Sequence, residues 1–102
     1  MDIQLKRGLL EVCVLSVLQQ EDSYGYKIVK DVSGIIEISE STLYPILKRL
    51  EINNSLKVYE VSHNGRLRKY YSITNAGKKA INDFIGEWQD VMKVYNFIKG
   101  DQ

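Results

Sequence analysis

The chain has 102 residues, 44% of them hydrophobic and 26% charged, and a formal net charge of +1. This length and composition suit one ordinary globular domain and exclude two. The single cysteine, Cys13, excludes an internal disulfide, and no run reaches the roughly 18 apolar residues of a membrane span. The N-terminus also lacks a signal-peptide pattern, so we expect a cytoplasmic protein in a reducing compartment, with no membrane partner.

The first two predicted helices span Gln4 to Gln20 and Tyr24 to about Val32. The first is apolar over more than one face, which places it at the centre of a core or between two partners. Ser23 is predicted to cap the second helix and Gly34 to end it. Gly25 inside this helix costs about 1 kcal/mol relative to alanine, so we expect another helix to approach it closely.

A third helix lies within Ile38 to Leu56. Its apolar stripe has helical spacing and consists of Leu43, Ile46, Leu47 and Leu50. The opposite face carries hydroxyls, a phenol and two cations, namely Ser41, Thr42, Tyr44, Lys48 and Arg49. These groups can donate to phosphate oxygens and reach base edges in a major groove, although a solvated outer face is the simpler interpretation of this helix alone.

The start of the third helix has two interpretations. Either Ser39 or Ser41 can cap it, because a side-chain oxygen there accepts from a free backbone N–H. With Ser41 as the cap, Pro45 ends the first turn and removes about one hydrogen bond. With Ser39 as the cap, Pro45 lies deeper and should bend the helix.

A β-hairpin follows. Leu56 to Ser62 alternate as a strand, Asn64-Gly65 is a strong turn signal, and Leu67 to Ile73 return. A turn centred on Asn64-Gly65 sets the register, with Leu56 facing Ile73, Val58 facing Tyr71, Tyr59 facing Tyr70, Glu60 facing Lys69 and Val61 facing Arg68. From residue 63 to residue 79 the chain has no carboxylate but carries Arg66, Arg68, Lys69, Lys78 and Lys79. This local basic patch suits contact with phosphate.

Thr74 is predicted to cap a last helix that runs to about Lys99, where Gly100 stops it. Its apolar positions follow a heptad seam: Ile81, Phe84, Trp88, Val91, Tyr95 and Ile98. So wide an apolar surface exceeds what one small body can cover, which favours pairing with a second copy into a homodimer. The alternative is a helix packed only on its own domain.

Three helices followed by a hairpin, with the third helix polar on one side, describe a winged helix-turn-helix. We therefore expect a mainly α fold with a small β-hairpin, in which a winged-helix DNA-binding domain (1–73) and a C-terminal dimerisation helix (74–102) form one compact unit. The third helix would enter a major groove of double-stranded DNA, and the basic hairpin would contact the backbone or the adjacent minor groove.

The chain resembles the PadR family of bacterial transcriptional regulators. The matching pieces are Ser23-Tyr24-Gly25-Tyr26, Ser41-Thr42-Leu43-Tyr44-Pro45 with Lys48-Arg49-Leu50-Glu51, and the run from Arg68 to Gly77. The resemblance to its short subgroup implies a homodimeric repressor of operator DNA. It implies DNA-binding roles for Ser41, Thr42, Tyr44, Lys48, Arg66, Arg68 and Lys69, with Tyr24 and Lys27 as weaker candidates for phosphate contact. The tight turn departs from the longer wing of many relatives, so contact with the DNA backbone is the expectation here.

Trp88 is the only tryptophan and lies in the heptad seam. In similar multidrug-binding proteins, a tryptophan at this point binds flat aromatic or cationic drugs at the dimer centre. The resemblance implies an effector pocket completed by Phe84, Met92 and Tyr95, with Cys13 or Val14 of the first helix. Stacking and cation–π attraction would supply the affinity. The alternative is that Trp88 is simply a large residue of the dimer core.

Two other classes of function are alternatives to DNA recognition. An enzyme is not expected, because the one histidine, His63, lies on an exposed turn and no metal-ligand cluster, phosphate loop or nucleophile elbow appears. We accordingly expect no cofactor and no metal. The second class is a winged-helix protein-interaction module without specific DNA readout; the basic, hydroxyl-bearing third helix argues against it.

Overall fold

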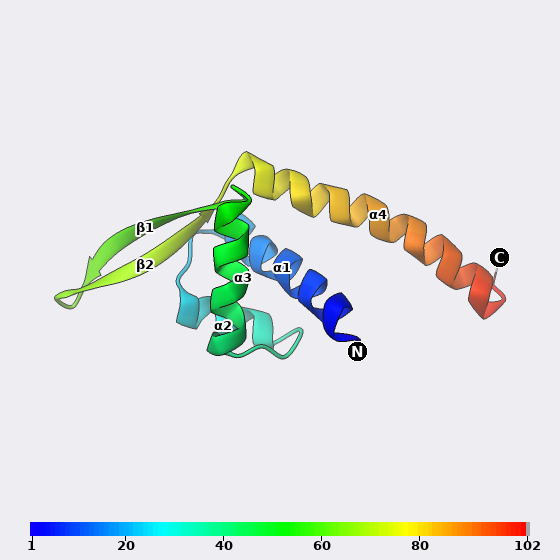
Figure 1. The fold of residues 1–102 in the computed structure, drawn as a ribbon, viewed down its shortest axis with the longest axis horizontal. Helices are drawn as coiled ribbons and strands as arrows, with labels where there is room; N and C mark the ends of the chain where they lie inside the picture. The colour runs from blue at the N-terminus through cyan, green and yellow to red at the C-terminus, as the bar shows by residue number, and fades with distance from the viewer. Residues whose placement is uncertain (102) are drawn as a thin grey trace.

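A computed structural model describes residues 1–101. Three helices form the body: α1 (Ile3–Gln20), α2 (Gly25–Ser33) and α3 (Glu40–Ile52). An antiparallel hairpin of β1 (Leu56–His63) and β2 (Arg66–Ile73) follows, and then the long helix α4 (Asn75–Lys99). The hairpin and α4 project from opposite sides of the body, so the molecule is elongated, 59 × 26 × 21 Å (Figure 1). This mainly helical architecture with a hairpin wing confirms the predicted fold class.

Helix α1 lies at the centre of the body and contacts α2, α3, β2 and α4. Its buried side chains are Leu10, Val14, Leu15 and Leu18. The stripe of α3 predicted from the sequence, Leu43 to Leu50, is buried against them. The core therefore explains why α1 is apolar on more than one face, as predicted.

The hairpin has the predicted register, from Leu56 opposite Ile73 to Val61 opposite Arg68. Asn64 and Gly65 have φ angles of 51° and 78°. Two consecutive left-handed residues make a type I′ turn, whose twist matches that of the two strands. The Asn-Gly pair therefore fixes how the two strands align.

The prediction that Ser23 caps α2 is wrong. Ser23 is buried and pairs with Tyr71 of β2: its N–H donates to the Tyr71 carbonyl (3.2 Å) and its carbonyl accepts from the Tyr71 N–H (2.8 Å). Tyr24 occupies the cap position of α2, and its side chain makes no capping hydrogen bond. The backbone pairing overrides the local capping preference of serine, and it ties the hairpin to the start of α2.

Ser39, not Ser41, caps α3: its Oγ accepts from the Thr42 N–H at 3.3 Å. Pro45 therefore lies in the helix interior. Because proline has no N–H, the carbonyl of Ser41 lacks its usual α-helical donor.

Thr74 caps α4 as predicted, accepting from the Gly77 N–H at 3.1 Å. The same hydroxyl donates to the carbonyl of Asn54 at 2.6 Å, and the Thr74 N–H donates to the carbonyl of Ser55 at 3.1 Å. The start of α4 is thus joined to the turn that ends α3. Across residues 1–101, no helix has the length and apolar character needed to cross a membrane.

Candidate nucleic-acid interface

The outward face of α3 presents polar groups on a rigid element. Ser41, Thr42, Tyr44 and Lys48 are all exposed. The Ser39 hydroxyl lies 3.0 Å from that of Ser41 and 3.1 Å from that of Thr42, so three hydroxyls gather at the start of the helix. Hydroxyls, a phenol and an ammonium on one face can hydrogen-bond phosphate oxygens and base edges.

Tyr44 packs across the first turn of α2. A Cβ built at Gly25 would lie 2.7 Å from the Tyr44 hydroxyl, a separation that real contacts do not show. This confirms the prediction that another helix approaches Gly25 closely. The contact fixes the ring while leaving 49% of the residue exposed, so Tyr44 is held in position beside solvent.

An aromatic ladder joins the hairpin to the start of α2. The Arg68 guanidinium carbon lies 4.0 Å from the centre of the Tyr24 ring, and the Tyr24 and Tyr70 ring centroids are 5.5 Å apart. Tyr70 stacks in turn on Tyr59 at 5.8 Å, with an angle of 22° between the rings. The ladder orients Arg68, which is half-buried, toward the body.

The far end of this ladder is a hydrogen bond. The Tyr59 hydroxyl donates to Asp22 Oδ2 at 2.6 Å, and this bond to a carboxylate raises the pKa of the phenol. The strand pattern predicted Tyr59 opposite Tyr70, but it gave no sign of the bond to Asp22. Nothing in the local sequence pattern pairs residues 37 positions apart.

A hollow of about 320 Å³ lies where α2, α3 and β2 meet. Its lining residues are Tyr24, Gly25, Tyr26, Tyr44, Arg68, Lys69 and Tyr71. The uncapped N-terminus of α2 opens here, and its free N–H groups carry partial positive charge. Together with Arg68 and Lys69, these donors form a surface suited to an anion such as phosphate.

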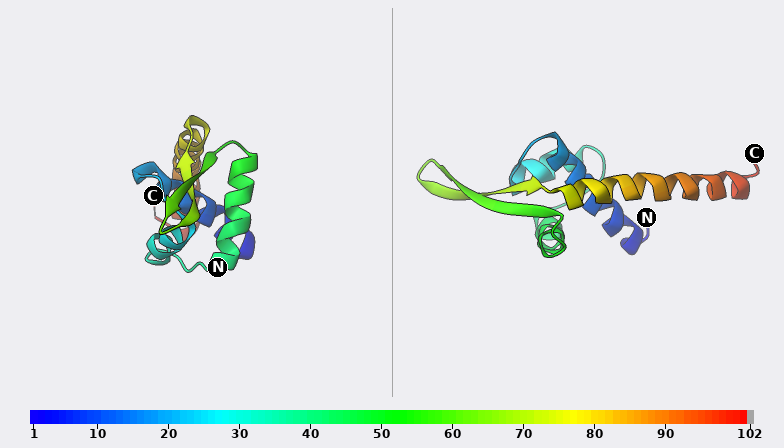
Figure 2. Two further views of the ribbon diagram at one scale, coloured as in Figure 1. Left: turned by 90° about the vertical axis from the view of Figure 1, so that its left-hand side faces the viewer. Right: turned by 90° about the horizontal axis from the view of Figure 1, so that it is seen from above.

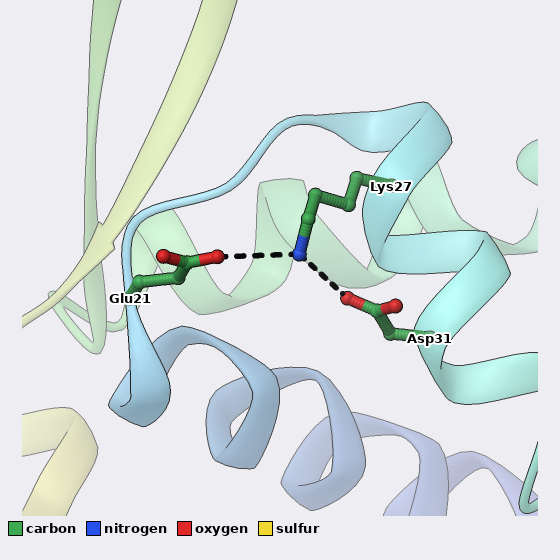
Figure 3. A network of polar contacts seen from close by, with 3 residues as sticks. All are labelled: Glu21, Lys27 and Asp31. Atoms are coloured by element: carbon green, nitrogen blue, oxygen red, sulfur yellow. Dashed lines mark hydrogen bonds and ion pairs between the residues drawn. The ribbon is translucent and has the colours of Figure 1, made fainter.

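Lys27 lies in a different environment from the other predicted DNA contacts. Its ammonium forms ion pairs with Asp31 Oδ2 at 3.1 Å and Glu21 Oε1 at 3.3 Å (Figure 3). The hydrogen bond to Asp31, followed by the one to Glu21, raises the pKa of this lysine. Two carboxylates therefore engage the charge that a phosphate would need, and we leave Lys27 out of the interface.

The hairpin tip is open to solvent. His63, Arg66 and Lys69 are exposed, and within residues 1–101 Arg66 and Lys69 form no ion pair. The same part of the chain contains no group of three or more histidine, cysteine or acidic residues that could hold a metal ion. The tip therefore offers unpaired cations for a negatively charged surface.

Helix α4 carries a second candidate site. Phe84 and Trp88 stack at 5.6 Å with 16° between their rings, and both are half-buried. Val91, Met92, Tyr95 and Ile98 are exposed. A shallow hollow of about 340 Å³ is lined by Phe84, Ile85, Trp88, Gln89 and Met92. Tyr95 is not part of it.

Two predicted residues of α4 and α1 belong to the core instead. Val14 is completely buried and cannot line an open pocket, and Ile81 is 6% exposed and packs within its own domain. Cys13 is half-buried in a separate apolar hollow with Phe84, and burial raises the pKa of its thiol. The part of the predicted seam that is not buried in the body therefore begins at Phe84.

Comparison with known proteins decides the family. The model of the family described as "Transcriptional regulator PadR-like family" matches residues 14–83. The chain belongs to this PadR-like family. An uncharacterised protein of Lysinibacillus sphaericus is 35% identical to this PadR-like chain over 101 residues, covering 92% of both.

Solved structures of PadR-like regulators share this fold. A transcriptional regulator from Clostridium thermocellum has a TM-score of 0.84 and 35% identity, over 94% of this chain and 95% of that one. A PadR family regulator from Clostridium difficile R20291 has a TM-score of 0.79 and 36% identity, over 87% and 96%. Bacillus subtilis PadR, solved with operator DNA, has a TM-score of 0.71 over 76% of this chain and 46% of that one; at 22% identity, its likeness is one of fold.

Proposed function

We propose that this PadR-like protein is a homodimeric repressor that binds operator DNA with α3 and the hairpin. The observation that carries the proposal is that the exposed polar face of α3 and the cations of the hairpin border one hollow, which Tyr44, Arg68 and Lys69 line together. An α-helix fits the major groove, and hydroxyl, phenol and ammonium groups on its outer face can reach base edges.

In this arrangement each group has a distinct role. Ser41, Thr42, Tyr44 and Lys48 face the bases and the nearest phosphates. Tyr24, Arg68 and Lys69 hold a phosphate at the start of α2, where the helix dipole adds to their donors. Arg66 contacts the backbone from the hairpin tip. Bacillus subtilis PadR, of the same fold, was solved with operator DNA, which supports operator DNA as the ligand of this fold.

The proposal is tested by fluorescence anisotropy on DNA from upstream of the protein's own coding region, with a random duplex of equal length as control, across a salt series. We expect a preference of roughly a thousandfold or more for the upstream DNA and a steep salt dependence. Weak binding that is equal on both duplexes would favour the protein-interaction module. Absence of binding at low salt would reject DNA recognition.

We also propose that residues 74–102 act as a dimerisation helix for a winged-helix unit of residues 1–73. Val91, Tyr95 and Ile98 are exposed and Phe84 and Trp88 only half-buried, so a long apolar surface is left with little cover from its own chain. In a homodimer, a twofold axis makes such a surface self-complementary.

Trp88→Ala is expected to weaken dimerisation by about tenfold or more, because a tryptophan at the centre of an apolar seam contributes strongly to association. Sedimentation equilibrium measures the monomer–dimer constant. Asn82→Ala, an exposed change on the same helix outside the seam, is the control and should leave the constant unchanged. Equal constants for wild type and Trp88→Ala would remove Trp88 from the interface.

The stacked Phe84–Trp88 pair further supports an effector site for a flat aromatic cation, completed by Met92. Because Trp88 is the only tryptophan, its fluorescence reports directly on this site. Rhodamine 6G is expected to quench it with saturation at one site and to lower operator affinity. Quenching that rises linearly without saturation would leave Trp88 a structural residue of the seam.

A further inference from the structure

A second recess, with a mixed apolar and charged lining, borders α3 on the side away from the hairpin. We name it the α1–α3 groove; it has a volume of about 430 Å³ and is lined by Ile3, Lys6, Arg7, Leu10, Glu37, Ile38, Ser39, Thr42, Pro45, Ile46 and Arg49. Seen from above, α3 appears end-on, with the hairpin extending to one side and the N-terminal end of α1 lying on the other (Figure 2, right). The groove thus mirrors the hollow on the hairpin side.

The charges of the groove favour an anion. Lys6, Arg7 and Arg49 line it, against one carboxylate, Glu37. Within residues 1–101, Lys6 and Arg7 form no ion pair, in contrast to Lys27 of α2. Their charges therefore remain available to an external partner.

Arg49 is fixed in place at the inner wall. Its Nε donates to Glu11 Oε1 at 2.9 Å, which orients the guanidinium across α1 and α3. Its Nη2 is buried and has no acceptor among the described residues. The hydroxyls of Ser39 and Thr42 line the same recess and add donors at the start of α3.

The geometry of DNA indicates what fits here. An α-helix with its side chains is about 10–12 Å wide, and the major groove is about 12 Å wide, so a helix inside it has a phosphate strand along each flank. On α3, Tyr44 borders the hollow on the hairpin side, whereas Thr42 borders the α1–α3 groove. Both flanks of the reading helix are therefore lined by cations and hydroxyls.

We infer that the α1–α3 groove binds phosphates of the DNA strand opposite the one held near Arg68, through Lys6, Arg7 and the start of α3. This inference rests on the proposed function. It extends the interface to the first turns of α1, a helix that the sequence predicted to lie at the centre of a core or between two partners, with no role in DNA binding. Glu37 opposes the phosphates and limits the affinity.

The test compares wild type with Lys6→Gln/Arg7→Gln on a random duplex, by anisotropy between about 50 and 200 mM NaCl. Each phosphate contact contributes about 0.9 to the slope of log K against log salt. We expect the double variant to flatten the slope by about one to two units and to bind roughly tenfold more weakly at low salt. Lys30→Gln/Lys93→Gln, in the last turn of α2 and on α4, removes the same net charge outside both candidate phosphate sites and should change the slope far less.

A second variant is expected to change the affinity for DNA in the opposite direction. Glu37→Gln removes the carboxylate without shortening the side chain, and it should tighten binding about two- to fivefold at low salt. Three outcomes would overturn the groove as a phosphate site while leaving the proposed function intact. The first is a salt slope for Lys6→Gln/Arg7→Gln equal to that of wild type, and the second is an equal loss of slope in the two double variants. The third is a changed dimer mass for Lys6→Gln/Arg7→Gln, which would place its effect on assembly. A wild type that does not bind DNA at low salt would overturn both.

Discussion

Replacing Gly77 with alanine is expected to destabilise the fold by about 3 kcal/mol or more, which for a chain of this size lowers the melting temperature by about 15 °C. A Cβ at this position would overlap the carbonyl oxygen of Ser55 and lie 2.6 Å from Cγ1 of Ile73. The Ser55 carbonyl also accepts from the Thr74 N–H, so moving it would break the join between α3 and α4. Thermal unfolding followed by circular dichroism, at fixed protein concentration, measures the effect.

Gly86→Ala is the matched control. It also lies inside α4, but nothing lies within 4 Å of its added Cβ. Alanine has the higher helix propensity, so this variant should gain about 0.5–1 kcal/mol. A melting temperature for Gly77→Ala within a few degrees of wild type would contradict the close packing at this corner.

Tyr44→Ala is expected to reduce the preference for operator over random DNA by roughly 10- to 100-fold, which corresponds to about 1–3 kcal/mol of base discrimination. Non-specific binding should change little, because Tyr44 carries no charge and the phosphate contacts remain. Competition anisotropy with operator and random duplexes gives the ratio. Losses of the same size on both DNAs would assign Tyr44 to the backbone instead.

Two companion variants sharpen this result. Tyr44→Phe keeps the ring and removes the hydroxyl, so it separates a hydrogen bond to a base from an apolar contact. Gly25→Ala places a Cβ against that hydroxyl. Because the end of a flexible side chain can move, we expect Gly25→Ala to retain stability yet lose part of the operator preference.

The elements and their order were predictable from the sequence because each depends on local patterns. The Asn64-Gly65 turn, the register of the hairpin and the cap at Thr74 follow from residue types at fixed short spacings. The apolar stripe of α3 follows from helical periodicity. Such signals need no knowledge of the rest of the chain.

Other features depend on distant parts of the chain. Serine is a preferred residue type at a helix N-cap, but the backbone of Ser23 pairs with that of Tyr71 instead. Ile81 fits the heptad seam, but the body of the domain buries it. The role of Gly77 depends on a carbonyl from another turn, which no spacing rule reveals.

The candidate interface was predictable in type and only partly in detail. The exposed groups of α3 and the hairpin cations were selected from their chemistry. The engagement of Lys27 by two carboxylates and the seating of Arg68 on Tyr24 emerge only in three dimensions. Charged side chains have many neighbours within reach, so sequence alone does not assign their partners.

The hydrogen bonds from Thr74 to Asn54 and Ser55 have a mechanical consequence. They join α3 to a 25-residue helix about 37 Å long, which acts as a lever arm. A change of about 10° in how two such arms cross would move the attached reading helix by roughly 6 Å, about a fifth of the roughly 34 Å between adjacent turns of DNA and half the roughly 12 Å width of the major groove. In the proposed dimer, small rearrangements where the arms meet would thus set whether both reading helices can enter the DNA together.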